Sequence, residues 1–454
     1  MNEESYKRII VINSPLYENT CTSANEDYLP PLGLGLVYTA LKTHFNAEFI
    51  DCLAENMTTD NLIAYLNKQC FDVICINIFS TNYIQVKKVV ESVLCCHHWI
   101  IGGISTKTLY PEIFKWETAA RISVVYGDGE LIVSDIINES VKQLSISIEH
   151  ENRRFYSIDK DSEYYNTNIS YEILDRRIFT FEPEINIFGE KEICIYTSRG
   201  CPYNCAYCMA ACSRNHELGI PRQKTPDRII HELKTVTEIY TNVEAVRVVD
   251  DLFLYNEKSF IDACTIFNNF SFKWRAMCHI RSIHALKDNL LLNKLFESGC
   301  RELFIGIESG SPKILHEIHK TTSIEIIKES VIRILNVGIS VKGYFICGFP
   351  DETINDLEQT YELAKHLADY AKERNLHFRN STFQFRPYYG TELYDKIVSK
   401  NNIRYNSLLY NTRISQRINF HIRNKTFNFD SGNYSLANDD DLHDYIMKMN
   451  NLNA

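Results

Sequence analysis

Three closely spaced cysteines are the residues of this chain with the clearest chemistry. Cys201, Cys205 and Cys208 form a C-x3-C-x2-C run within Ser198-Arg199-Gly200-Cys201-Pro202-Tyr203-Asn204-Cys205-Ala206-Tyr207-Cys208. Three thiolates on one short loop suit a soft metal. Three protein ligands also leave one position of a cubane iron–sulfur cluster open to a reactive ligand.

Two other interpretations of the run stay open at this point. Cys212 extends it to C-x3-C-x2-C-x3-C, which would allow a closed zinc or electron-transfer site with four thiolates. Cysteine spacing alone also allows a disulfide. The spacing favours the open cluster over both.

Length and composition describe a soluble, acidic, multidomain protein. The 454 residues suggest two or three domains, and the net charge of −10 argues against a general nucleic-acid binder. Most of the 15 cysteines are scattered singly, without regular disulfide spacing. No signal peptide and no apolar run of about 20 residues is visible, so we expect a reducing, cytoplasmic location without a membrane partner.

The elements that must position these residues fall into two series. Residues 1–140 alternate apolar strands with helices, and this βα rhythm predicts a doubly wound parallel sheet. The predicted strands are 8–13, 47–51, 72–77, 99–103 and 122–126. Residues 141–190 are polar and irregular, which indicates a connection between domains.

The βα rhythm returns over residues 191–400. Six predicted strands make a partial (β/α)6 barrel, and residues 401–454 form a C-terminal extension. These strands are 193–197, 245–249, 272–277, 302–307, 341–346 and 381–386. Barrel enzymes place their chemistry at the carboxyl ends of strands, where the cysteines, the Asp250-Asp251 pair and Glu308 fall. That agreement supports the open cluster.

The cysteine run, with Tyr207 before its last cysteine, resembles the signature of the radical S-adenosylmethionine (SAM) superfamily. The resemblance implies a [4Fe-4S] cluster on Cys201, Cys205 and Cys208, whose open iron binds SAM and whose reduction yields a 5′-deoxyadenosyl radical. It implies further SAM contacts, which we assign to Tyr207, Asp250, Glu308, Ser309 and Arg386. Three of them have a plain alternative: Asp250 as a helix cap, Ser309 as an N-cap, and Arg386 in a surface salt bridge.

The first domain resembles the cobalamin-binding domain that precedes many radical SAM cores. Small residues follow its predicted strands, and Gly-Asp-Gly-Glu at 127–130 resembles a motif of that family. The resemblance implies contacts to cobalamin, where it binds, from Ser80, Gly102, Gly103, Gly127, Gly129 and Glu130. Taken singly, each glycine is better explained by a tight turn, and only the set as a whole points to a ligand. No Asp-x-His-x-x-Gly run is present, so no histidine of this domain is expected on the cobalt.

Most members of this subgroup are methyltransferases, and the resemblance implies methyl transfer to a secondary metabolite or peptide natural product. The alternative is a dehydratase, epimerase, cyclase or rearrangement enzyme that uses no cobalamin. Cys347 and Cys212 are then candidate hydrogen donors to a substrate radical. A further hypothesis is that the chain is no enzyme but a non-catalytic iron–sulfur or zinc-binding protein. The expected partners are a small-molecule or peptide substrate and an electron donor such as flavodoxin or ferredoxin, without nucleic acid.

Overall fold

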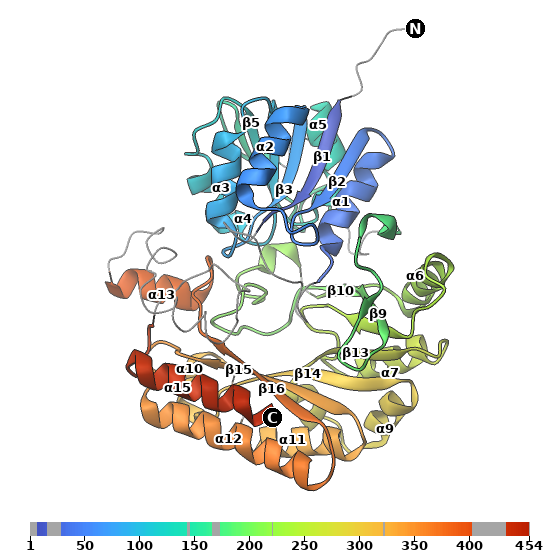
Figure 1. Ribbon diagram of the computed structural model, residues 1–454, viewed down its shortest axis with the longest axis vertical. Helices are drawn as coiled ribbons and strands as arrows, with labels where there is room; N and C mark the ends of the chain where they lie inside the picture. Colours follow the sequence, from blue (N-terminus) through green and yellow to red (C-terminus); the bar gives the residue numbers. More distant parts are fainter. Residues whose placement is uncertain are drawn as a thin grey trace.

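Two seven-stranded sheets form the framework of the protein (Figure 1). The computed structural model describes residues 7–15, 29–142, 146–165, 173–219, 221–320, 323–401 and 433–453. The first sheet has the strand order β2-β1-β3-β4-β5-β7-β6, and the second has the order β16-β15-β14-β13-β12-β9-β8. A two-stranded ribbon, β10-β11, lies between them.

The first sheet is the doubly wound parallel sheet that the βα rhythm predicts. Its first five strands are parallel and lie in the order 2-1-3-4-5, with almost wholly buried apolar residues in β1 and β3. The strands are β1 (Arg8–Asn13), β2 (Asn46–Asp51), β3 (Val73–Asn77), β4 (His98–Gly102) and β5 (Arg121–Tyr126). The helices are α1 (Leu32–Lys42), α2 (Thr59–Gln69), α3 (Tyr83–Ser92), α4 (Thr106–Ile113), η1 (Gly129–Leu131) and α5 (Val133–Asn138).

The segment expected as a connection, 141–190, contributes strands to both sheets. β7 (Arg153–Ser157) pairs parallel to β5, and β6 (Ile146–His150) pairs antiparallel to β7. After η3 (Arg176–Ile178), β8 (Glu184–Ile185) forms the edge of the second sheet beside β9. The strands were not predicted because their sequence is polar. Polar residues are nevertheless buried there: the Arg153 guanidinium, for example, donates to the carbonyl of Ala120 at 2.8 Å.

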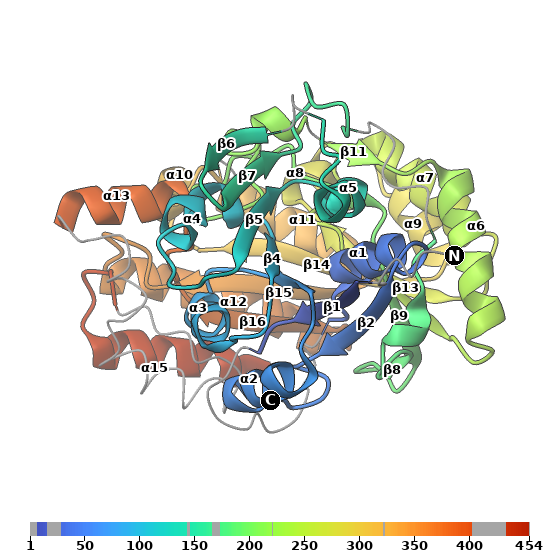
Figure 2. The ribbon, with the colours of Figure 1, turned by 90° about the horizontal axis from the view of Figure 1, so that it is seen from above.

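The second sheet contains the six parallel strands of the predicted partial barrel. Its parallel strands are β9 (Lys191–Ile195), β12 (Ala245–Val248), β13 (Lys273–Cys278), β14 (Cys300–Glu308), β15 (Ser340–Cys347) and β16 (Phe378–Gln384). Its helices are α6 (Pro226–Ile239), α7 (Glu257–Phe267), α8 (Ile280–His284), α9 (Leu290–Glu297), α10 (Pro312–Glu317), α11 (Ile324–Asn336), α12 (Ile354–Glu373) and α13 (Glu392–Asn401). Figure 2 shows the first sheet lying over this half-barrel.

The C-terminal helix α15 (Asp439–Asn450) lies along α12 on the outer side of the half-barrel (Figure 1). Its buried residues Leu442, Ile446 and Met449 face the core of the barrel. A short turn, η6 (Asn451–Asn453), follows it. Residues 402–432 of the expected extension lie outside the described residues. None of the described helices combines the length and apolar character that crossing a bilayer requires.

Candidate active site between the two sheets

The cysteine run lies on a loop enclosed by a short β-ribbon. β10 (Ser198–Arg199) and β11 (Arg222–Gln223) pair antiparallel, so Ser198 lies opposite Gln223 and Arg199 opposite Arg222. The ribbon brings the two ends of the loop together, and α6 begins directly after it, capped by the Thr225 side chain. η4 (His216–Leu218) lies within the loop. We call residues 200–221 the cluster loop.

Cys201, Cys205 and Cys208 are half-buried and affect one another electrostatically. Burial raises the pKa of Cys201 to about 11 and that of Cys208 to about 12, and the nearby Cys205 thiol adds to both shifts. Among the residues described above, no three His, Cys, Asp or Glu side chains converge as ligands of one metal ion would. A cubane cluster needs no such convergence, since each cysteine binds a different iron. The three thiols therefore fit a [4Fe-4S] cluster.

Cys212 has polar contacts of its own within the cluster loop. Its thiol lies 2.9 Å from the Oδ1 atom of Asn204, and its backbone N–H donates to the carbonyl of Tyr203 at 3.0 Å. The structure thus gives no support to a closed site with four thiolates.

Glu308 ends β14 beside the cluster loop in a strained conformation. Its φ of 67° lies in the left-handed region, and the pairing with β15 shifts register between Gly306 and Glu308. Such strain is characteristic of functional sites. Its carboxylate accepts a hydrogen bond from the Lys320 ammonium at 2.9 Å, and both side chains are buried.

Lys320 and Tyr207 complete this group around Glu308. The charge of Glu308 raises the pKa of Lys320 despite its burial. Burial raises the pKa of the Cys205 thiol, and the Lys320 charge opposes this increase. Burial, followed by the charge of Glu308, raises the pKa of Tyr207 well above its ordinary value. Sequence analysis missed Lys320, since nothing in its spacing from Glu308 indicates that the two meet.

Asp250 and Asp251 have different roles: the first supports the structure, and the second lies at the site. Asp250 is buried and accepts hydrogen bonds from the Thr197 backbone N–H at 2.5 Å and the Ser198 hydroxyl at 2.7 Å. It therefore fixes the start of the ribbon. Asp251 lines a cavity and accepts from the Gly200 N–H at 3.2 Å. The assigned cofactor contact, Asp250, is thus less exposed to a ligand than its neighbour.

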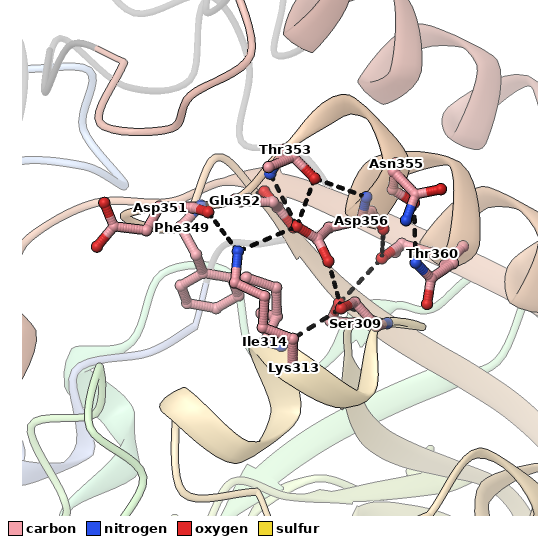
Figure 3. Close-up of polar contacts among 12 residues, drawn as sticks. Ser309, Lys313, Ile314, Phe349, Asp351, Glu352, Thr353, Asn355, Asp356 and Thr360 are labelled. Atoms are coloured by element: carbon pink, nitrogen blue, oxygen red, sulfur yellow. Dashed lines mark hydrogen bonds and ion pairs between the residues drawn. The ribbon is translucent and has the colours of Figure 1, made fainter.

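Ser309 points into a structural network and not into a cavity. It is fully buried, 3.0 Å from the Thr360 hydroxyl, and accepts from the Ser311 N–H at 3.1 Å. Ser311 caps α10 and donates to Asp356 at 2.6 Å. Figure 3 shows Ser309, Asp356 and Thr360 in this network. The network ties the end of β14 to α12, so Ser309 serves as support in this structure.

Cys347 lies on the face of β15 that points away from the mouth of the barrel. Its thiol is fully buried, 3.9 Å from the Met449 sulfur on α15. The preceding residue, Ile346, faces a cavity instead, because successive side chains of a strand point to opposite faces. This placement argues against Cys347 as a hydrogen donor.

The first of two cavities, which we call the barrel cavity, lies at the mouth of the half-barrel. It has a volume of about 510 Å³ and is mostly apolar. Its lining is Ile104, Tyr207, Cys208, Met209, Ala210, Asp251, Ile346, Phe383, Gln384, Phe385, Arg386 and Tyr388. Arg386 therefore faces the same space as the cluster cysteine Cys208, as an anion-binding role requires.

The second, the interdomain cavity, lies between the carboxyl ends of the first sheet and the cluster loop. It has a volume of about 370 Å³. Five residues assigned to cobalamin line it, namely Gly102, Gly103, Gly127, Gly129 and Glu130. Ser80 does not, because its hydroxyl accepts from the Tyr389 backbone N–H at 3.0 Å.

Two glycines of the interdomain cavity open it to a bulky ligand. A side chain placed on Gly33 or Gly102 would meet no protein atom within 4 Å. Gly103 has a different role, since its φ is 130° and an added Cβ would lie 2.5 Å from the carbonyl oxygen of Ile78. The cavity thus has the open cradle that a corrin ring needs, and Phe79, which sequence analysis missed, also faces it.

The carboxylates of the Gly-Asp-Gly-Glu turn bind arginines of the ribbon. The Arg222 guanidinium donates to both oxygens of Asp128, at 2.5 and 3.1 Å. Arg199 contacts Asp128 and lies 2.8 Å from Glu130. Burial favours a neutral Asp128, but the two guanidinium groups outweigh it and lower the pKa of Asp128. Sequence analysis missed both arginines, and it assigned Glu130 only to cobalamin.

The two cavities meet at the cluster loop. Ile104, Ala210 and Asp251 line both of them. Residues 195–364, which include the cysteine run, match the model of the radical SAM superfamily. The chain contains a radical SAM domain. That family uses a [4Fe-4S] cluster and SAM, and the matched residues include Cys201, Cys205 and Cys208.

Relatives of known sequence extend the likeness beyond the radical SAM domain. The chain is 27% identical to an uncharacterized methyltransferase of Pyrococcus horikoshii over 390 residues, which cover 82% of this chain and 79% of that protein. It is 25% identical to the anaerobic magnesium-protoporphyrin IX monomethyl ester cyclase of Rubrivivax gelatinosus over 279 residues, 59% of this chain. The match spans only 48%, about half, of that cyclase.

A solved structure shares the fold of both domains. The radical SAM methyltransferase TsrM of Kitasatospora setae, solved with cobalamin and a [4Fe-4S] cluster, superposes with a TM-score of 0.60. The match covers 87% of this chain and 78% of TsrM at 15% identity. The predicted architecture, a cobalamin-binding-type sheet followed by a radical SAM half-barrel, is therefore confirmed.

Proposed function

We propose that the protein is a cobalamin-dependent radical SAM methyltransferase acting on a secondary metabolite or a peptide natural product. The observation that carries this proposal is the meeting of the two cavities at Ile104, Ala210 and Asp251. One cavity suits a corrin and the other holds a cluster cysteine. A methyl carrier and a radical source would thus face the same space.

In this proposal the barrel residues hold the cluster and SAM. Cys201, Cys205 and Cys208 would hold the cluster, which together with SAM would supply the 5′-deoxyadenosyl radical. Glu308, held by Lys320 at 2.9 Å, presents a buried carboxylate to the hydroxyl or amino groups of SAM. Arg386 offers a guanidinium to a carboxylate in the barrel cavity.

The interdomain cavity would hold cobalamin, which supplies a carrier for the methyl group. Gly33 and Gly102 leave room for the ring, and the aromatic Phe79 offers an apolar surface. The described residues that line this cavity include no histidine. The cobalt would accordingly lack a histidine ligand from this wall, as the resemblance implies.

The substrate is expected to be a small molecule or peptide with an apolar body. Phe383, Phe385 and Tyr388 supply an aromatic wall, while Asp251 and Arg386 can anchor polar groups. An electron donor such as flavodoxin or ferredoxin would reduce the cluster. The Pyrococcus protein and TsrM are both named as methyltransferases, which supports methyl transfer.

Anaerobic purification with added cobalamin tests the proposal. We expect cobalt bound near one atom per chain, and 5′-deoxyadenosine and S-adenosylhomocysteine released from SAM after reduction. Protein that forms 5′-deoxyadenosine and turns over substrate without cobalt would contradict it.

The second candidate is a cobalamin-independent dehydratase, epimerase, cyclase or rearrangement enzyme. Among these reactions, the likeness to a cyclase of Rubrivivax gelatinosus favours cyclisation. Activity of the cobalt-free protein would support this candidate. Cys212, at the cluster loop, is then better placed than the buried Cys347 to donate hydrogen.

A further inference from the structure

Two acids and two arginines form a compact charged cluster in one wall of the interdomain cavity. Asp128, Glu130, Arg199 and Arg222 all line it. The side chains of Asp128, Glu130 and Arg222 are 5–8% exposed, and that of Arg199 is 21% exposed. We call these four residues the arginine clasp. Two guanidinium groups thus face two carboxyl groups in a mostly buried site.

The clasp joins two parts of the molecule that are far apart in sequence. Asp128 and Glu130 follow β5 of the first sheet, whereas Arg199 and Arg222 face each other across the ribbon that encloses the cluster loop. Arg199 precedes Cys201 by two residues. Buried guanidinium–carboxylate contacts therefore join the Gly-Asp-Gly-Glu turn to the base of the cluster loop.

Further contacts between the first domain and the cluster loop strengthen this link. The Tyr126 hydroxyl donates to Asn215 Oδ1 at 2.6 Å. The Lys107 ammonium donates to the carbonyl of Arg214 at 2.8 Å. On the barrel side, Arg214 also pairs with Asp395 at 2.8 Å, but this contact is largely exposed and does not touch either cavity wall. It offers a matched control.

We propose that Asp128 is a positioning residue that couples ligand binding in the interdomain cavity to SAM binding at the cluster loop. This inference rests on the proposed function, with cobalamin as the ligand. A ligand seated against the clasp restricts the turn at 127–130 and, through Arg199 and Arg222, the loop that carries the cysteines. SAM then binds a loop that is already ordered, which gives positive coupling.

The test compares SAM affinity with and without hydroxocobalamin. Cluster-loaded protein is kept anaerobic, and the Kd for labelled SAM is measured by equilibrium dialysis for wild type, Asp128→Asn and the control Asp395→Asn. We expect cobalamin to lower the Kd for SAM by at least about 5-fold in wild type and in Asp395→Asn. In Asp128→Asn both ligands still bind, but the Kd for SAM without cobalamin divided by the Kd with cobalamin falls to about 1.

Two further variants separate positioning from a general loss of structure. Asp128→Glu keeps the charge and should restore part of the coupling. Glu130→Gln leaves both hydrogen bonds from Arg222 to Asp128 intact and should reduce the coupling only partly. The cluster's electron paramagnetic resonance spectrum provides a second readout, since its change on SAM addition should depend on cobalamin only where coupling is present.

The outcomes separate this inference from the proposed function. Coupling that survives in Asp128→Asn, or wild type that binds cobalamin with no effect on SAM, would overturn the inference alone. Wild type that binds no cobalamin would overturn both it and the methyltransferase proposal.

Discussion

At the scale of single residues, the ion pair of Lys320 and Glu308 is the charge pair that most directly affects the site. Both side chains are at most 7% exposed. Removing one member of a buried pair leaves the other charge uncompensated, which costs far more than the net value of the pair. The pair thus supports the fold as well as the proposed SAM site.

We predict that Lys320→Met lowers the free energy of unfolding by about 3–5 kcal/mol, because the Glu308 carboxylate stays buried without a cation. Urea denaturation of the cluster-free protein measures this. The double variant Lys320→Met/Glu308→Gln should recover much of the loss, since no buried charge remains. Equal losses in the single and double variants would show that the charge is not the cause.

The cysteines give a second prediction at this scale. Cys208→Ala removes a proposed iron ligand, whereas Cys212→Ala removes only a thiol that contacts Asn204. After anaerobic reconstitution, iron analysis should find about four iron atoms per chain in Cys212→Ala and most of the iron lost in Cys208→Ala. The reverse pattern would favour a cluster that includes Cys212.

At the scale of elements, strand β4 shows two consequences of its position in the sheet. It begins at His98, which is buried with Nε2 2.8 Å from the Ser123 hydroxyl. It ends at Gly102, which lines the interdomain cavity. A substitution at His98 therefore tests stability, and a substitution at Gly102 tests ligand binding.

Burial, reinforced by the charge of Arg121, lowers the pKa of His98 to about 3. An unfolded histidine has a pKa of about 6.5. Below pH 6.5 the unfolded chain binds a proton that the folded chain does not, so the contribution of His98 is present above pH 6.5 and declines as the pH falls toward 3.

We expect wild type to lose about 2 kcal/mol more stability than His98→Gln between pH 7 and pH 5. Denaturant titrations at several pH values measure the difference. Using the difference between the two proteins removes the contribution of other groups, such as His279, whose pKa burial also lowers. Parallel pH profiles for the two would rule out a neutral, buried His98.

Gly102→Val should fill the interdomain cavity without disturbing β4. An added Cβ there meets no protein atom within 4 Å, and valine is favoured in strands. We predict an unchanged denaturation midpoint and at least about 10-fold weaker cobalamin binding by absorbance titration, about 1.4 kcal/mol. Gly103→Val is the contrasting variant, because it collides with Ile78 and should destabilise the fold. Unaltered cobalamin affinity in Gly102→Val would place the ligand elsewhere.

The same scale shows what sequence patterns could and could not predict. Continuous apolar runs such as that of β1 predict buried parallel strands, and all eleven strands predicted from the βα rhythm are present. β6 and β7 escaped prediction because polar residues such as Arg153 are buried there through hydrogen bonds to backbone carbonyls. Composition does not show that a buried polar side chain has hydrogen-bond partners in the backbone.

At the scale of the whole molecule, the sequence predicts which residues end each strand but not how the two domains meet. Placement of Gly102 or Glu308 at strand ends follows from local pattern. The contacts of Arg199 and Arg222 with Asp128 depend on docking one sheet over the other, across at least 71 residues. The choice of Asp251 over Asp250 as the cavity residue likewise depends on tertiary structure.

The central claim is that one chain brings cobalamin and SAM together through adjoining cavities. Incubating reduced, cobalamin-loaded protein with SAM labelled in its methyl carbon tests this most directly. We predict that label is recovered bound to the cobalamin of wild type, and much less of it in Gly102→Val. Recovery of all label in SAM, from wild type that has retained and reduced its cobalamin, would contradict the account.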